Sequence, residues 1–293
     1  PALKRLLVET VARTEEMLNL NGSVGALIDD IYGEDALHAA TGRNWWIGRP
    51  VEQPGSNPVI FELGSSIGSV LEHWPKEQVV KCLIYYHPDD HLDRRLAQES
   101  QVRTLCEATN ESGHELLLEL IPAKGLPFQQ DTTIRTMTRF YNLGIHPDWW
   151  KLPAPSAEQW KQIDELIKER DPYSRGVLML GLNAPLDQLI ASFEDARNSS
   201  TCHGFAVGRS IFQDPPSANI HWREIESLLH HLGADIEPSH GARFKITLNK
   251  VEAFLHHPHN SNTCSKQDIK ALREVLSHAG VTLSRYEEDH QRV

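Results

Sequence analysis

The chain has 293 residues, of which 40% are hydrophobic, and its formal net charge is −11 at pH 7. This length exceeds the roughly 100–200 residues of a typical domain, so we expect one large barrel-type domain or two domains. The acidic balance argues against a nucleic-acid-binding surface along the whole chain. Because the sequence has neither a long uncharged apolar stretch nor a signal-peptide layout at its N-terminus, we expect a soluble, cytoplasmic protein with no membrane partner.

Apolar segments of strand length alternate with helix-like segments over the first 213 residues. Continuous apolar strands between amphipathic helices are typical of a parallel sheet covered by helices. Six or seven such units favour a (β/α)8-type TIM barrel, and an open parallel sheet is the alternative. The expected strands lie in residues 24–30, 44–50, 58–63, 79–90, 114–122, 148–153, 176–182 and 204–212.

The pattern changes after the turn-rich segment "DPPSAN", residues 214–219. Residues 222–234 and 265–281 have helical periodicity, whereas 242–248 and 251–258 alternate as strands do. We therefore expect two domains, a barrel in residues 1–213 and a small α+β module in residues 217–293.

Charged side chains stand at the ends of the expected barrel strands, where the catalytic residues of parallel barrels gather. Lys81, Glu119 and Lys151 are unusual because they lie inside apolar segments. A buried lysine needs either a partner charge or a chemical use for a depressed pKa. We expect Lys151 to be a nucleophilic amine and Glu119 to move protons; a structural ion pair or a surface lysine with a buried stem is the alternative. The strand-end residues are Asp29, Asp30, Arg49, Lys81, His87, Asp89, Asp90, Glu119, Lys151 and Arg209.

Six motifs in order over residues 1–213 resemble the aldolase-like barrel at the C-terminal end of bacterial inositol-catabolism proteins, the 5-dehydro-2-deoxygluconokinase fusions. More distantly, they resemble class I tagatose-bisphosphate aldolases. The motifs are "GALIDDIYGEDAL", "VVKCLIYYHPDD", "HELLLELIP", "PDWWKLPAP", "GVLMLGLNAP" and "GFAVGRSIF".

This resemblance implies cleavage of 2-deoxy-5-keto-gluconate 6-phosphate into dihydroxyacetone phosphate and malonate semialdehyde. It assigns the Schiff base to Lys151, acid–base catalysis to Glu119 and the second active-site lysine to Lys81, with no metal and no cofactor. It also implies a first barrel strand ahead of the helix that matches residues 1–14. This sequence begins after that strand, and the expected barrel therefore lacks it.

A phosphorylated sugar also needs an anion site, which barrels commonly build after their last two strands. Gly181 and Gly208 would allow close backbone approach there, and Arg209 would supply a forked donor. Strand-to-helix turns and a surface ion pair are the alternatives. Asp30 and Arg49 are further candidate substrate contacts, although shaping of the proline-rich loop 49–58 is the stronger interpretation for Arg49 and Glu52.

Residues 217–288 resemble a second family, the HicA-type toxins, an α-β-β-β-α fold related to double-stranded-RNA-binding domains. The resemblance implies RNA or a cognate antitoxin-like protein as partner. Ribonuclease members carry serine and histidine in a turn where this chain has Ala242 and Arg243, so RNA cleavage is not expected, and His240 is no assured substitute.

Histidines and cations near the end of the module suggest two further sites. His257 and His259 would suit a metal only weakly, because Pro258 disturbs the strand between them. Arg243, Lys245 and Lys250 could instead form a phosphate-facing surface.

The sequence thus favours a carbon–carbon lyase of the class I, Schiff-base type, acting on a phosphorylated keto-sugar acid. An RNA- or partner-binding protein with an inactive barrel scaffold is the alternative. Whether the protein forms a homo-oligomer stays open.

Overall fold

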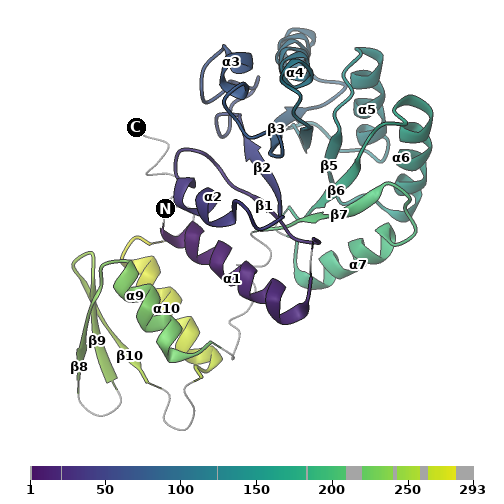
Figure 1. Ribbon diagram of the computed structural model, residues 1–293. Helices are drawn as coiled ribbons and strands as arrows, with labels where there is room; N and C mark the ends of the chain where they lie inside the picture. Colours follow the sequence, from purple (N-terminus) through teal and green to yellow (C-terminus); the bar gives the residue numbers. More distant parts are fainter. Residues whose placement is uncertain are drawn as a thin grey trace. The chain divides into compact units, whose positions relative to one another are not determined.

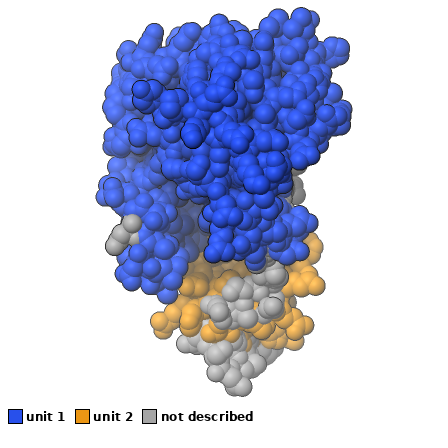
Figure 2. Space-filling view, turned by 90° about the vertical axis from the view of Figure 1, so that its right-hand side faces the viewer, with its two compact units in different colours: residues 1–212 blue, residues 213–293 orange. Residues whose placement is uncertain are grey.

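The structure is a computed structural model that describes residues 2–20, 22–123, 125–182, 184–208, 220–239, 243–257 and 263–281. The chain divides into two compact units, residues 1–212 and 213–293, which Figure 2 shows in different colours. The hydrophobic cores of the two units share no residue. Among the described residues, no helix combines the length and the apolar content needed to cross a lipid bilayer.

Unit 1 is built on a seven-stranded parallel sheet whose strands follow one another in chain order (Figure 1). Each crossover between neighbouring strands contains a helix, which is the arrangement predicted from the alternating pattern. The strands are β1 (Gly25–Leu27), β2 (Trp46–Pro50), β3 (Val79–Tyr86), β4 (Leu116–Pro122), β5 (Trp149–Pro153), β6 (Gly176–Leu180) and β7 (Cys202–Ala206).

The helices of unit 1 pack one apolar side against the outer face of this sheet, and Figure 1 shows α4 to α7 around it. In α6 the buried residues Trp160, Ile163 and Ile167 recur at helical spacing, and Ser156 and Gln159 form a capping box at its start. The helices are α1 (Ala2–Leu18), α2 (Glu34–Ala40), α3 (Ile67–Leu71), α4 (Leu92–Ser112), α5 (Thr132–Asn142), α6 (Ala157–Arg170) and α7 (Leu186–Ala196).

Aromatic side chains show that the sheet curls into a nearly closed barrel. The ring of Trp46 on β2 lies 5.8 Å from that of Trp149 on β5, and Trp149 lies 6.2 Å from His203 on β7. These strands are not neighbours in the sheet, so their side chains meet only across a common interior. In the described part of the chain β7 and β1 do not pair. The barrel prediction is therefore confirmed at the level of a parallel, nearly closed seven-stranded barrel.

The strand expected in residues 58–63 is absent, and this prediction is wrong. Phe61 forms only an isolated bridge with Glu52. Its apolar residues Val59 and Phe61 are buried in the outer core, and the Val59 amide donates to the side chain of Gln98. The apolar pattern thus reflects a loop that packs on the core rather than a strand of the sheet.

Successive side chains of each strand point to opposite faces of the barrel wall. On β3, Val80, Cys82 and Ile84 join the outer core that α4 and α5 cover. The alternate residues, Lys81 among them, therefore face the interior of the barrel. This alternation selects which strand residues can meet inside it.

Unit 2 is a small α+β module in which two helices accompany a three-stranded antiparallel sheet of order β10-β9-β8. The order of its elements is α-β-β-β-α. Periodicity alone missed β8, because this strand of four residues contains a single large apolar side chain, that of Ile236. The elements are α9 (Trp222–His231), β8 (Asp235–Pro238), β9 (Arg243–Leu248), β10 (Val251–His256) and α10 (Lys266–His278).

Candidate active site

Two lysines of the barrel interior contact one glutamate. Glu119 on β4 is the cross-strand partner of Lys151 on β5, and the Lys151 Nζ lies 2.9 Å from the Glu119 Oε1. The Lys81 Nζ, on β3, lies 2.9 Å from the Glu119 Oε2. Only 6–7% of the surface of each of the three residues is exposed. The barrel thus brings together the three residues that the sequence singled out as catalytic, with the carboxylate between two amines.

Glu52 is a fourth member of this charged cluster, although the sequence favours a loop-shaping role for it. It follows β2 by two residues, is 8% exposed and pairs with Lys81. Its Oε2 is buried and meets no donor in the described part of the protein. The available signal was a carboxylate placed just beyond a buried strand, in line with the strand-end rule applied to the other residues.

The electrostatic surroundings differ between the two lysines. Burial lowers the pKa of Lys151, the charge of Lys81 adds to this effect, and the Glu119 carboxylate opposes it. Burial also acts to lower the pKa of Lys81, but the carboxylates of Glu52 and Glu119 outweigh burial and raise it. Burial disfavours the Glu119 carboxylate, yet the two amines hold its pKa below the usual value. Lys151 is therefore the better placed of the two lysines to supply a neutral amine.

An aromatic layer lies beside the charged cluster, one inward-facing step nearer the amino ends of the strands. It contains Trp46, Trp149 and His203, and the Trp149 Nε1 donates to the Glu115 carboxylate at 2.7 Å. A methyl group on Gly48 would come within 2.5 Å of the Leu27 side chain, so this part of the wall is closely packed. On one side the charged cluster therefore faces packed aromatic rings instead of water. In such a setting the interactions between its charges are stronger than in water.

Arg49 and Asp30 pair with each other and lie apart from Lys151. Arg49 is the register partner of Val80, which belongs to the outer core, so its side chain leaves the barrel wall on the outer face. Its guanidinium lies 3.6 Å from the ring centroid of Trp74, donates to Gln78 at 2.7 Å and pairs with Asp30. Burial lowers the pKa of Arg49, and Asp30 opposes this effect. Their predicted role as substrate contacts gains no support from this placement.

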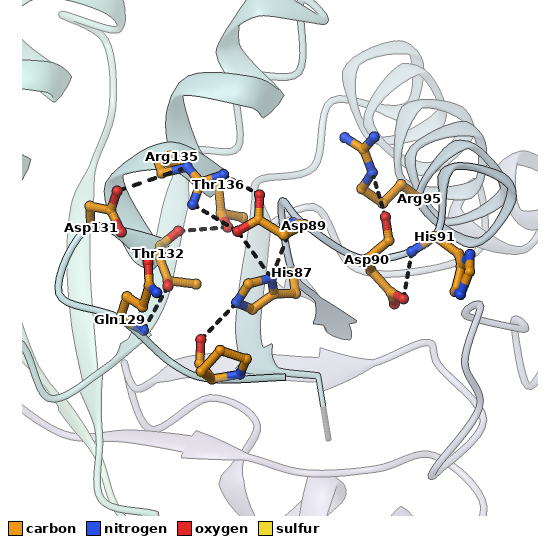
Figure 3. A network of polar contacts seen from close by, with 11 residues as sticks. His87, Asp89, Asp90, His91, Arg95, Gln129, Asp131, Thr132, Arg135 and Thr136 are labelled. Atoms are coloured by element: carbon orange, nitrogen blue, oxygen red, sulfur yellow. Dashed lines mark hydrogen bonds and ion pairs between the residues drawn. The ribbon is translucent and has the colours of Figure 1, made fainter. Parts of the chain in front are cut away.

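The strand-end residues that follow β3 form a separate polar network (Figure 3). His87 is buried, and its Nε2 lies 3.1 Å from the Pro127 carbonyl oxygen, while its Nδ1 accepts a hydrogen bond from the Asp89 amide. The Asp89 carboxylate in turn binds Arg135 on α5, with one bond of 2.9 Å. The network ties the loop after β3 to the loop after β4, and this explains His87 and Asp89 without any contact to Lys151.

The predicted phosphate site lies partly outside the described residues. Gly181 directly follows β6 and Gly208 follows β7 by two residues, so both stand beyond the carboxyl ends of their strands. Arg209 lies outside the described residues. A methyl group on Gly208 would meet no described atom within 4 Å, so packing among the described residues does not require glycine there. The phosphate role of these residues stays a prediction.

A cavity of about 380 Å³ opens at the opposite end of the barrel. Its lining segments, residues 146–148 and 170–174, precede β5 and β6 and thus lie at the amino ends of these strands. Parallel barrels carry their chemistry at the carboxyl ends. We therefore place the candidate site at the charged cluster and not at this cavity.

The sheet of unit 2 carries acidic as well as basic side chains. Lys245 pairs with Glu252 at 2.7 Å, and Glu237 is its register partner on β8. This pairing weakens the predicted phosphate-facing surface, because the carboxylates would repel a phosphate backbone. His257 lies against the rings of Trp222 and Phe244. The predicted residues His240, Ala242 and His259 lie outside the described residues, and the described ones contain no cluster of three metal-ligating side chains.

Comparison with known proteins connects the chain to one family. No curated protein matches the sequence. Among solved structures, the crystal structure of Cgl0159 from Corynebacterium glutamicum (Brevibacterium flavum), a structural genomics target, has 17% sequence identity and a TM-score of 0.49. That match covers 64% of this chain and spans 64% of the length of the other. The model of a family described as "uncharacterized protein conserved in bacteria" matches residues 1–228, and the chain belongs to this family, DUF2090.

Proposed function

We propose that unit 1 is a class I aldolase, a carbon–carbon lyase that forms a Schiff base on Lys151. The observation that carries the proposal is the contact between the buried Lys151 amine and the Glu119 carboxylate inside the barrel, at 2.9 Å. A lysine nucleophile must be neutral, and burial together with the charge of Lys81 lowers the pKa of Lys151. A proton-transfer group must lie within hydrogen-bond reach of the reacting atoms, and Glu119 does.

The proposed reaction uses these two side chains in turn. The neutral Lys151 Nζ adds to the carbonyl carbon of a ketone to give a carbinolamine, which loses water and takes up one proton from solvent to give a protonated imine. Glu119 then takes the proton from the hydroxyl group on the carbon beyond the scissile bond. The bond breaks, an aldehyde leaves, and the electron pair moves into the imine to form an enamine. Protonation of the enamine carbon and hydrolysis release the second product and restore the free amine.

Lys81 has a different role in this proposal. The carboxylates of Glu52 and Glu119 hold it in its charged form, so it supplies a fixed cation beside the reacting centre. A fixed cation stabilises negative charge that develops on an oxygen of the substrate. Lys81 thus acts by charge, and Lys151 acts by covalent bonding.

The substrate class rests on the sequence resemblance. It is a phosphorylated keto-sugar acid such as 2-deoxy-5-keto-gluconate 6-phosphate, cleaved to dihydroxyacetone phosphate and malonate semialdehyde. Gly181, Gly208 and Arg209 are the candidates for its phosphate group, because two of them lie beyond the ends of β6 and β7.

Reductive trapping tests the proposal directly. The protein is incubated with dihydroxyacetone phosphate and borohydride, and the modified lysine is located by mass spectrometry. We expect one adduct on Lys151, which is lost in Lys151→Met. Lys161→Met is the matched control, because this lysine is 74% exposed and lies on α6. The proposal fails if wild-type protein carries no adduct, or if Lys151→Met carries the same adduct as wild type.

A further inference from the structure

Two lysines compete for the same chemistry in the barrel interior. The amines of Lys81 and Lys151 each lie 2.9 Å from an oxygen of Glu119, and the two residues are buried to the same degree. Neither the distance to the acid–base group nor desolvation therefore explains why one lysine rather than the other would be the nucleophile. Their contacts differ in one respect, since Lys81 has a second carboxylate partner, Glu52.

We propose that Glu52 is a positioning residue that selects the nucleophile: its carboxylate keeps Lys81 charged, which leaves Lys151 as the lysine that can present a free amine. This inference rests on the proposed Schiff-base function and extends it to a residue outside the Lys81–Glu119–Lys151 group. Glu52 acts through Lys81 and need not touch the substrate.

The charges that face each lysine support this assignment. Lys81 lies between two carboxylates, Glu52 and Glu119, with Lys151 as the neighbouring cation. Lys151 contacts a single carboxylate, Glu119. Burial and the positive charge of Lys81 lower the pKa of Lys151, and Glu52 acts on it only as a charge outside contact, the smallest of these effects. Two carboxylates in direct contact hold Lys81 in its charged form, whereas the single carboxylate in contact with Lys151 does not outweigh burial and the charge of Lys81. The opposite directions of the pKa changes of Lys81 and Lys151 agree with this count.

The backbone around Glu52 holds its carboxylate in place. The amide of the preceding residue, Val51, donates to the Lys81 carbonyl oxygen at 3.0 Å, so the segment after β2 runs along β3. Glu62 donates its amide to the Val51 carbonyl oxygen at 2.8 Å, and Glu52 itself bridges to Phe61. In the described part of the chain, Lys81 is the hydrogen-bond partner of the Glu52 side chain, and the second oxygen of that side chain has none. The carboxylate is therefore directed at one amine.

Glu62 is a carboxylate that feels the charge of Glu52 but lies outside the charged cluster, and it provides a matched control. Burial raises the pKa of Glu62, and Asp29, Glu52 and Asp30 add to the effect. No described contact joins Glu62 to Lys81. Removal of its charge should leave the two lysines as they are in the wild-type protein.

The test measures which lysine is neutral, with and without the Glu52 charge. Wild-type, Glu52→Gln and Glu62→Gln proteins are labelled with acetic anhydride across a pH series, and mass spectrometry follows acetylation of Lys81 and Lys151. In wild type we expect Lys151 to react at lower pH than Lys81. In Glu52→Gln the midpoint for Lys81 should fall so that its neutral fraction rises about 10-fold or more at a given pH, the usual effect of losing one nearby opposite charge. Glu62→Gln should match wild type.

Reductive trapping with dihydroxyacetone phosphate supplies the second readout. We expect the adduct on Lys151 alone in wild type, and on both Lys81 and Lys151 in Glu52→Gln.

An unchanged acetylation midpoint of Lys81 in a folded Glu52→Gln protein overturns the inference. If Glu52→Gln does not fold, Glu52→Asp replaces it; its shorter carboxylate should move the midpoint in the same direction by less, and no movement again overturns the inference. If acetylation shifts as expected while no variant gives an adduct, the charge role of Glu52 is supported and the Schiff-base function is the part that fails.

Discussion

Lys151 and Glu119 are register partners on adjacent parallel strands, and the Lys151 Nζ lies 2.9 Å from the Glu119 Oε1. Because the partner side chains of neighbouring strands point to the same face, the backbone alone brings the amine and the carboxylate together. Lys81 approaches the same carboxylate from β3, on its other side. The barrel wall thus holds an acid–base group between two amines without relying on a loop.

Replacement of the shared carboxylate should separate adduct formation from turnover. Glu119→Gln keeps the shape of the side chain but cannot accept a proton, so we expect it to form the Lys151 adduct while turnover falls by roughly 100-fold or more. Product formation from the keto-sugar acid phosphate is measured beside borohydride trapping. Glu115→Gln serves as the control, because Glu115 binds Trp149 and Arg175 instead of a lysine of the cluster. Turnover equal to wild type in Glu119→Gln would remove Glu119 from the mechanism.

The pH dependence of trapping should reveal the lowered pKa of Lys151. The neutral amine is the reactive form, so the trapping rate rises with pH and levels off above the pKa. We expect the midpoint to lie below about 10.4, the value of an exposed lysine. Glu119 opposes the lowering, so Glu119→Gln should move the midpoint further down. A wild-type midpoint at or above that of an exposed lysine would contradict the assignment.

Trp150 on β5 should be a main contributor to the stability of unit 1. Its side chain is fully buried, packs edge-on against Phe140 and Tyr141, and donates from Nε1 to the Tyr141 hydroxyl at 2.9 Å. Trp150→Ala leaves a large cavity and should cost about 3–5 kcal/mol of unfolding free energy in urea titrations. Tyr173→Ala should stay within about 0.5 kcal/mol of wild type, because Tyr173 is 90% exposed. A cost below about 1 kcal/mol for Trp150→Ala would show that this packing is not as described.

Unit 2 should fold by itself and should not cleave RNA. It has its own core, which includes Trp222, Leu229, Ile246 and Leu272. The helices α9 and α10 contribute side chains to this core. We expect residues 213–293, expressed alone, to melt cooperatively, and to bind structured RNA weakly and less so as salt rises. The measurements are thermal unfolding and incubation with structured and single-stranded RNA.

A gradual melt would argue against an independently folding module. RNA cleavage that disappears in His257→Ala or His240→Ala would instead support the HicA-type interpretation over a partner-binding or purely structural one.

Local sequence patterns were sufficient to locate the seven strands of the barrel and three of the charged residues. An apolar run of strand length predicts a buried strand, and a lysine or glutamate inside such a run marks a buried charge that needs a partner. Lys81, Glu119 and Lys151 could be found in this way, because burial and alternation along a strand are properties of a few consecutive residues.

The tertiary structure decided where the remaining charges go. Glu52 joins the cluster because the segment after β2 continues along β3, and Arg49 lies outside it because its register partner, Val80, faces the outer core. Residues 58–63 resemble a strand in their apolar pattern, yet they form a loop that packs on the core through Val59 and Phe61. The apolar pattern of a sequence predicts which side chains are buried. The partner of a buried charge depends instead on which strands are neighbours and on how the sheet closes.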